Sequence, residues 1–336
     1  MNLSHPHSSG TIVRCRRLLE PALREVVSGL HPWGARMVAF AMGWAGLDGR
    51  EQDADGGKGL RPAITMLSAE AVGGTAEDAL PAAVAVELVH AFSLAHDDII
   101  DRDELRRHRA TLWKAYGVGP ALLTGDALLA LAVSRLAARP EAMPYLSAAL
   151  IELVQGQTAD MAFENRPWSG PDVVTIEEYA EMAAGKTGGL LGAAAATGVA
   201  LGGAPELADR MWTMGRDLGV AFQIVDDVLG IWGDPRLTGK PVHNDLRRDK
   251  KTLPVLAALA SGGPAARELA AVLATGAADE DSVRRAAHLV EEAGGRERAR
   301  ALADRYLDSA LGVLDECLPD ATELRDVCHS LVDRVS

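Results

Sequence analysis

The chain has 336 residues, 48% of them hydrophobic and 24% charged, so it is long and apolar enough to bury a substantial core. Its formal net charge of −13 excludes the basic surface of a nucleic-acid-binding protein, and we expect no nucleic-acid partner. Cys15, Cys317 and Cys328 form no CxxC pair. They predict reduced thiols in the cytoplasm, and they argue against a disulfide framework or a zinc site.

Residues 1–18 lack the apolar core of a signal peptide, and we expect them to form a flexible tail. From residue 19 to residue 336, apolar side chains recur at three- and four-residue spacing, which is typical of helices. No convincing segment alternates with the period of two that marks a strand, and no long linker divides the chain. The sequence therefore predicts an all-α protein with a single large helical bundle over 19–336.

The first candidate site along the chain is the loop GGKGLRP at 56–62. Its glycines allow an anion to approach the backbone closely, and Lys58 and Arg61 supply positive charge. The signal is weak by itself, because an ordinary surface loop has the same composition.

An apolar helix is predicted at 80–96, and Asp97, Asp98 and Asp101 follow it. The helix dipole disfavours negative charge at a helix C-terminus, and neighbouring carboxylates repel one another, so a cation is expected there. Arg106 and Arg107 follow about one turn later. They are either anion contacts or members of a salt-bridged surface with Asp103 and Glu104, and the second reading is the commoner one for such a run.

Lys186 and Thr187 precede the most apolar segment of the chain, residues 190–204. That segment is shorter than the about 20 residues that a bilayer span requires, so it predicts a buried helix, and we expect no stable membrane anchor.

A second apolar helix, at about 207–229, carries Gln223, Asp226 and Asp227 near its end. Lys240 lies in the following Gly- and Pro-containing loop, and Lys250 lies downstream of it. Both lysines are candidates for phosphate contacts on a lid, although solvated loop lysines are individually the commoner case.

Asp97 and Asp101 are four residues apart, so both project from one face of a helix. Mg²⁺ prefers hard oxygen ligands and uses one or two carboxylates together with water and substrate phosphate. The two aspartate clusters therefore predict a multi-metal diphosphate site, with solvated helix ends as the alternative for either cluster alone.

Six stretches, in order and at matching separations, make the chain from about residue 25 onward resemble the trans-isoprenyl diphosphate synthases, also called polyprenyl synthetases. They are GGKGLRP at 56–62, ELVHAFSLAHDDIIDRDELRR at 87–107, GDALLA at 125–130, GKTGGLLG at 185–192, FQIVDDVLGIWGDPRLTGKP at 222–241 and DLRRDKKTLP at 245–254. The geranylgeranyl diphosphate synthases of bacteria look most similar. The resemblance implies the all-α isoprenoid synthase fold and a homodimer.

The resemblance also assigns roles to residues that match the family's motifs. Lys58, Arg61, His90 and Arg107 fall in the isopentenyl diphosphate pocket. Asp97, Asp101 and Asp226 fall at metal ligands, with the acidic residues Asp98 and Asp227 beside them. The allylic diphosphate is implied to contact Arg106, Lys186, Thr187, Gln223, Lys240 and Lys250.

The implied reaction joins isopentenyl diphosphate head to tail with a dimethylallyl, geranyl or farnesyl diphosphate. It uses three Mg²⁺ ions held with the bound diphosphate and needs no organic cofactor. Phe92, five positions before Asp97, and the neighbouring Ser93 are implied to stop the product near twenty carbons, as in geranylgeranyl diphosphate. The alternative for Phe92 is a plain core residue.

Two positions depart from the family's pattern. Gly230 replaces an aspartate that is often found in the second cluster, which predicts weaker metal organisation without loss of activity. Gly59 stands where an arginine is usual.

Two other functions stay open at this point. A terpene cyclase on the same fold would ionise one diphosphate without a second substrate, but Lys58, Arg61, His90 and Arg107 favour condensation. A non-catalytic partner subunit would have lost acidic residues, and the first cluster is intact. His96 is interpreted as a structural residue, because an Mg²⁺–diphosphate site has little use for imidazole.

Overall fold

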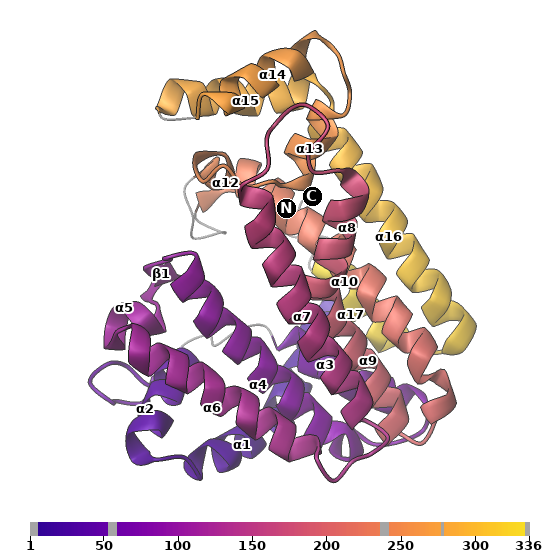
Figure 1. Ribbon diagram of the computed structural model, residues 1–336. Coiled ribbons are helices and arrows are strands. Elements are labelled where there is room, and N and C mark those ends of the chain that lie inside the picture. Colours follow the sequence, from indigo (N-terminus) through magenta and orange to yellow (C-terminus); the bar gives the residue numbers. More distant parts are fainter. Residues whose placement is uncertain (1–5, 53–58, 236–241, 277–278, 333–336) are drawn as a thin grey trace. The chain divides into compact units, whose positions relative to one another are not determined.

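The computed structural model describes residues 6–52, 59–235, 242–276 and 279–332, and most of them are helical (Figure 1). By its internal contacts the chain divides into two compact units. The first comprises residues 1–150, 190–212 and 314–330, and the second comprises 151–189, 213–313 and 331–336. The predicted all-α class is confirmed, and the strand content described is one two-residue pair, β1 Leu105–Arg106 with β2 Arg109–Ala110.

The first unit is built from α1 to α6, most of α9 and α17, and the first turns of α7 and α10. The helices that lie wholly or mostly in it, apart from α9, are α1 Pro6–Ser28, α2 Pro32–Ala41, α3 Leu60–Ala71, α4 Ala76–Ile100, α5 Leu112–Tyr116, α6 Val118–Leu136 and α17 Thr322–Val332. A 3-10 turn, Pro205–Leu207, precedes α10.

The second unit holds most of α7 Met143–Glu164, α10 Ala208–Trp232 and α16 Gly295–Cys317. It also holds α8 Ile176–Ala183, the π-turn η1 Ala184–Gly188, α12 Asn244–Arg247, α13 Leu253–Leu259, α14 Pro264–Ala274 and α15 Glu280–Glu292. The predicted buried helix at 190–204 is α9 Gly189–Leu201, whose residues are almost all buried, so this expectation is confirmed.

Helix α4 is the central element of the first unit and packs along α3 and α6. It begins at Ala76, earlier than predicted, because Thr75 and Asp78 form a capping box: the Thr75 hydroxyl accepts from the Asp78 N–H, and the Asp78 carboxylate accepts from the Thr75 N–H. By length and composition alone α4 and α6 could cross a membrane, a test that core helices of soluble proteins also pass, and 50% of the α4 window is buried.

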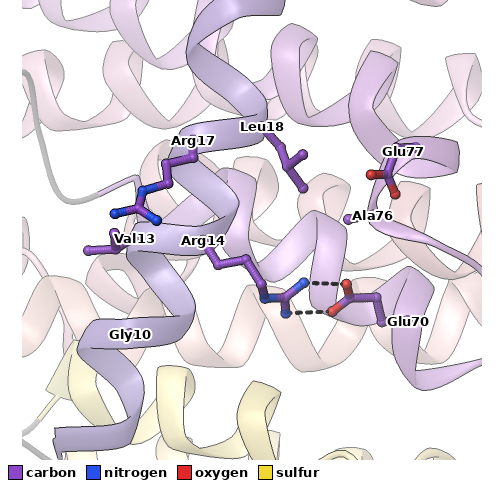
Figure 2. Close-up of a pocket in the computed structure, with 8 residues that line it drawn as sticks. All are labelled: Gly10, Val13, Arg14, Arg17, Leu18, Glu70, Ala76 and Glu77. Atoms are coloured by element: carbon purple, nitrogen blue, oxygen red, sulfur yellow. Dashed lines mark hydrogen bonds and ion pairs between the residues drawn. The ribbon is translucent and has the colours of Figure 1, made fainter.

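The structure differs from the predicted tail over residues 1–18, because α1 already begins at Pro6. Cys15, on this helix, is only 1% exposed. Arg14 donates to both carboxylate oxygens of Glu70 on α3, at 2.5 and 2.8 Å (Figure 2). The cavity of about 410 Å³ around this pair contains none of the residues predicted to bind substrate.

Candidate active site

The first aspartate cluster lies at the C-terminal end of α4, where the three carboxylates differ in burial. Asp97 and Asp101 are partly exposed one turn apart, and Asp101 caps the helix. Asp98 lies between them in sequence, points to another face of the helix and is 4% exposed. Two hard oxygen ligands at this spacing fit Mg²⁺, which takes its remaining ligands from water and phosphate. Within the described residues no group of three or more His, Cys, Asp or Glu side chains forms a ready-made metal cage.

The Asp98 carboxylate accepts two hydrogen bonds from an arginine. Arg106 Nε and a terminal nitrogen of its guanidinium donate to Asp98 Oδ1 at 2.9 and 2.8 Å. Burial raises the pKa of the Asp98 carboxyl, and the Arg106 hydrogen bonds oppose that rise. Asp98 therefore positions Arg106 beside the two partly exposed aspartates. The ion-pair partner of Arg106 is thus Asp98, and not the Asp103 or Glu104 of the surface alternative.

Arg106 and Arg107 are carried by the β1–β2 hairpin. Arg106 pairs with Arg109, so Arg107 and His108 form the two-residue loop, with φ of 50° and 61°. Positive φ at both positions is the backbone of a type I′ turn, which non-glycine residues adopt at a cost in strain. Arg109 anchors the hairpin by donating to the carbonyls of Phe40 and Ala45, both at 3.2 Å. The turn thus fixes the direction of two predicted diphosphate contacts.

A cluster of basic residues, Arg61, His90 and Arg107, lies at this hairpin. Arg61 donates to Nε2 of His90 at 3.4 Å, so the His90 ring accepts through Nε2. Burial, together with the charges of Arg61 and Arg107, lowers the pKa of His90 well below its usual value. The ring is therefore neutral near pH 7, while the arginines carry the positive charge. The structure brings these three predicted residues together, and Lys58 lies outside the described residues.

Sequence reasoning missed two charged neighbours of this basic cluster. Glu87 lies one turn before His90 on α4, and burial raises its pKa while Arg61, Arg107 and Arg16 act in the opposite direction. Arg16 comes from α1, in the segment expected to be a tail. Glu87 could have been found from the sequence, because its spacing of three residues from His90 places both on one helix face.

Phe92 and Ser93 lie on α4 between His90 and the aspartates, and both are half-buried. The Ser93 hydroxyl donates to the His90 carbonyl at 2.9 Å. The Phe92 ring packs edge to face against His96, with ring centroids 4.8 Å apart.

In the second unit, Asp227 on α10 is buried and fully engaged. Its Oδ2 accepts from the Tyr179 hydroxyl at 2.6 Å and from the Leu253 N–H at 3.0 Å, and its Oδ1 accepts from Gln223 at 3.1 Å. Burial and the charge of Asp245 raise the pKa of Asp227 to about 7. Asp226 is partly exposed. Asp227 thus ties α8, α10 and α13 together, and Asp226 is the member of the pair that reaches solvent.

Lys186 and Thr187 lie in the π-turn η1, a helical irregularity common at functional sites. Thr187 donates to Gln223 Oε1 at 2.8 Å, which links η1 to the Asp227 network. Lys186 donates to Asp160 on α7 at 2.5 Å, and sequence reasoning had not named Asp160. A side chain at Gly156 would lie 2.2 Å from the Lys186 backbone nitrogen, so a glycine there lets α7 approach η1.

The two adjacent lysines that follow α12 differ in burial. Lys250 is half-buried after α12, whereas Lys251 is 6% exposed and its ammonium lies 3.3 Å from the centre of the Trp168 ring. Lys240 lies outside the described residues.

Comparison with known proteins places the chain among prenyl-chain synthases. The family model for polyprenyl synthetase matches residues 51–290. The chain is 44% identical over 330 residues to a (2E,6E)-farnesyl diphosphate synthase of Mycobacterium tuberculosis, covering 94% of this chain and 90% of that one. It is 41% identical over 322 residues to a geranylgeranyl diphosphate synthase of the same organism, covering 94% and 89%.

A crystal structure of a polyprenyl synthetase from Streptomyces coelicolor A3(2) is similar throughout. It has a TM-score of 0.87 and 43% identity, and the alignment covers 96% of this chain and 98% of that one.

Proposed function

This chain belongs to the polyprenyl synthetase family of trans-prenyltransferases, and we propose that it condenses isopentenyl diphosphate with an allylic diphosphate in a Mg²⁺-dependent reaction. One observation carries the proposal. Helix α4 carries His90, which belongs to a basic cluster with Arg61 and Arg107, and about two turns later the carboxylates of Asp97 and Asp101. The basic cluster suits one diphosphate, and the carboxylates suit a second one bound with metal.

The donor set supports Mg²⁺ at Asp97 and Asp101 in the first unit and at Asp226 in the second. When bound, the ion would neutralise charge on the leaving diphosphate as its carbon–oxygen bond breaks. Arg106 is held beside the first cluster by Asp98, and Lys186 is held in η1 by Asp160. In each unit such a preorganised cation can stabilise the negative charge that develops on a departing diphosphate, and Lys240 and Lys250 are proposed for the same role.

The second substrate, isopentenyl diphosphate, is proposed to bind at Lys58, Arg61, His90 and Arg107. The carbon–carbon bond forms between its terminal alkene carbon and the first carbon of the allylic chain. Diphosphate departs from that allylic carbon, and a proton is lost from the new cation to the departing diphosphate. Because the cation reacts with water, the apolar helices must keep water out, and the interior of α4 is free of nucleophiles over Ala82–Val86.

The product proposed is geranylgeranyl diphosphate, with Phe92 as the residue that stops growth. The two mycobacterial relatives carry different product names, so similarity by itself leaves the length open between them. We also propose a cytoplasmic homodimer. The free thiols of its cysteines support the cytoplasmic location. The homodimer is supported by α6, on which Val118 is 47% exposed and Leu123 is 65% exposed, so that a second copy can pack against them.

The proposal is tested by incubating the pure protein with isopentenyl diphosphate, Mg²⁺ and each allylic primer in turn. Linear prenyl alcohols of one or more added units, recovered only after phosphatase treatment, are expected. A cyclic hydrocarbon released without phosphatase would indicate a terpene cyclase. No turnover by this chain alone, with activity regained on adding a co-purified catalytic partner, would indicate a non-catalytic subunit.

A further inference from the structure

The His96 ring is held between two helices of the first unit. It lies on α4 directly before Asp97, and its Nε2 lies 3.2 Å from the Leu122 carbonyl of α6. Because a carbonyl only accepts hydrogen bonds, Nε2 carries the proton and donates it. The Asp126 carboxylate lies 3.9 Å from the same nitrogen. The ring therefore directs its Nε2 at α6. Because this nitrogen carries a proton, it has no lone pair with which to bind a metal ion.

A glycine on α6 makes room for this ring. A Cβ added at Gly125 would lie 2.2 Å from His96 Nε2 and 2.4 Å from Cδ2, closer than any real contact. The imidazole therefore fills the volume that a side chain at 125 would occupy. This contact accounts for the start of the GDALLA stretch, which none of the substrate roles explained. By contrast, Gly119 on the same helix has nothing within 4 Å of an added Cβ.

The fixed ring in turn borders Phe92. The two residues are four positions apart on α4, and their rings meet edge to face at 66° with centroids 4.8 Å apart. A side chain whose neighbour cannot move has fewer accessible rotamers. The orientation of Phe92 therefore depends on a chain of contacts from Gly125 and Leu122 through His96.

We propose that His96, locked against α6 by Gly125 and the Leu122 carbonyl, is a positioning residue that sets product length by holding the Phe92 ring in place. The inference rests on the proposed function, because it concerns how a growing prenyl chain is stopped. It assigns the control of product length to Phe92 and His96 on α4 together with Gly125 on α6, where the sequence pointed to α4 alone.

The structural half of the inference is tested by thermal unfolding, which requires no enzymatic activity. Gly125→Ala is expected to lower the melting temperature by roughly 2 to 6 °C, because its methyl group collides with the ring. In a His96→Ala background the same substitution is expected to have no such effect, because the collision is gone. Gly119→Ala is the matched control and should leave the melting temperature unchanged or higher. An equal loss from Gly125→Ala with and without the ring would overturn the proposed contact.

The functional half is tested by the distribution of product lengths, normalised to total product. His96→Ala is expected to broaden the products toward longer chains by one or two isoprene units. In a Phe92→Ala background, His96→Ala should add nothing, because it acts through Phe92. Independent, additive changes would refute the positioning role while leaving prenyl transfer intact. If the wild-type protein forms no prenyl product but the melting temperatures are coupled, the proposed function fails and the contact stands.

Discussion

The carboxylate of Asp245, at the start of α12, occupies the space that a side chain at Gly230 would fill. A Cβ added at Gly230 would lie 1.9 Å from Asp245 Oδ2. Gly230 is one turn after Asp226 on α10, so Asp245 brings a carboxylate to the face where the family often has an aspartate at 230. The Asp245 carboxylate, from another segment of the second unit, therefore lies where an aspartate side chain at position 230 would lie.

The first prediction concerns this replacement. Gly230→Asp, which would bring the chain closer to the family's pattern, is expected to lower the free energy of unfolding by about 1–3 kcal/mol, because the new side chain overlaps Asp245 and adds a like charge. Adding Asp245→Ala should recover most of that loss. Denaturant unfolding measures both, with Gly312→Asp, which has open space around it, as the control. A stable Gly230→Asp single variant would contradict the described packing.

The second prediction concerns the buried carboxylate of Asp227. Tyr179→Phe removes the 2.6 Å hydrogen bond to Oδ2 and should cost about 1–3 kcal/mol, because a buried acceptor loses a donor. Urea unfolding near pH 7 is the measurement. Tyr306→Phe, at a half-buried site, should change stability by less than about 0.5 kcal/mol. Equal effects of the two substitutions would argue against a special role for the Tyr179 contact.

The third prediction concerns pH. The pKa of His90 is lowered in the folded protein, so the folded state resists a proton that the unfolded chain accepts below about pH 6.5. Stability contributed by His90 is therefore present above that pH and is lost as the pH falls. The loss has a slope of at most about 1.4 kcal/mol per pH unit. His90→Gln, which cannot titrate, should flatten the unfolding free energy between pH 6.5 and pH 5. Parallel curves for the two proteins would rule out a depressed His90 pKa.

The fourth prediction concerns product length. Phe92→Ala is expected to lengthen the products, because it removes bulk from the path of the growing chain. Ser93→Phe is expected to shorten them, because it adds bulk one residue closer to Asp97. Chain lengths are compared after phosphatase treatment. An unchanged profile in both variants would make Phe92 a plain core residue.

The two long apolar helices were predictable from sequence because their signals are local and redundant. The predicted helix at 80–96 is α4, which extends four residues further at each end, and the predicted helix at 207–229 is α10, which begins one residue later and ends three residues later. Residues 1–18 were expected to be a flexible tail, but the sequence contains a pattern that indicates a helix. Apolar residues recur every four positions at Cys15, Leu19, Leu23 and Val27, and all four are buried.

The partners of individual site residues were not predictable in the same way. Asp97, Asp98 and Asp101 are all aspartates on one helix end, and only the packed structure assigns Asp98 to Arg106. The same holds for Asp226 and Asp227. The contacts of Asp245 with Gly230, and of His96 with Gly125, join segments distant in sequence, and spacing along one helix carries no information about them.

The partly exposed aspartates are proposed to bind divalent metal together with diphosphate, and calorimetric titration of pyrophosphate into the protein measures this binding. We expect binding in the presence of Mg²⁺, none in EDTA, and an affinity at least about tenfold lower for Asp97→Asn and for Asp226→Asn. Asp126→Asn, an exposed carboxylate on α6, serves as the control. Binding of equal affinity without Mg²⁺, or in both cluster variants, would rule out metal-dependent diphosphate binding at these aspartates.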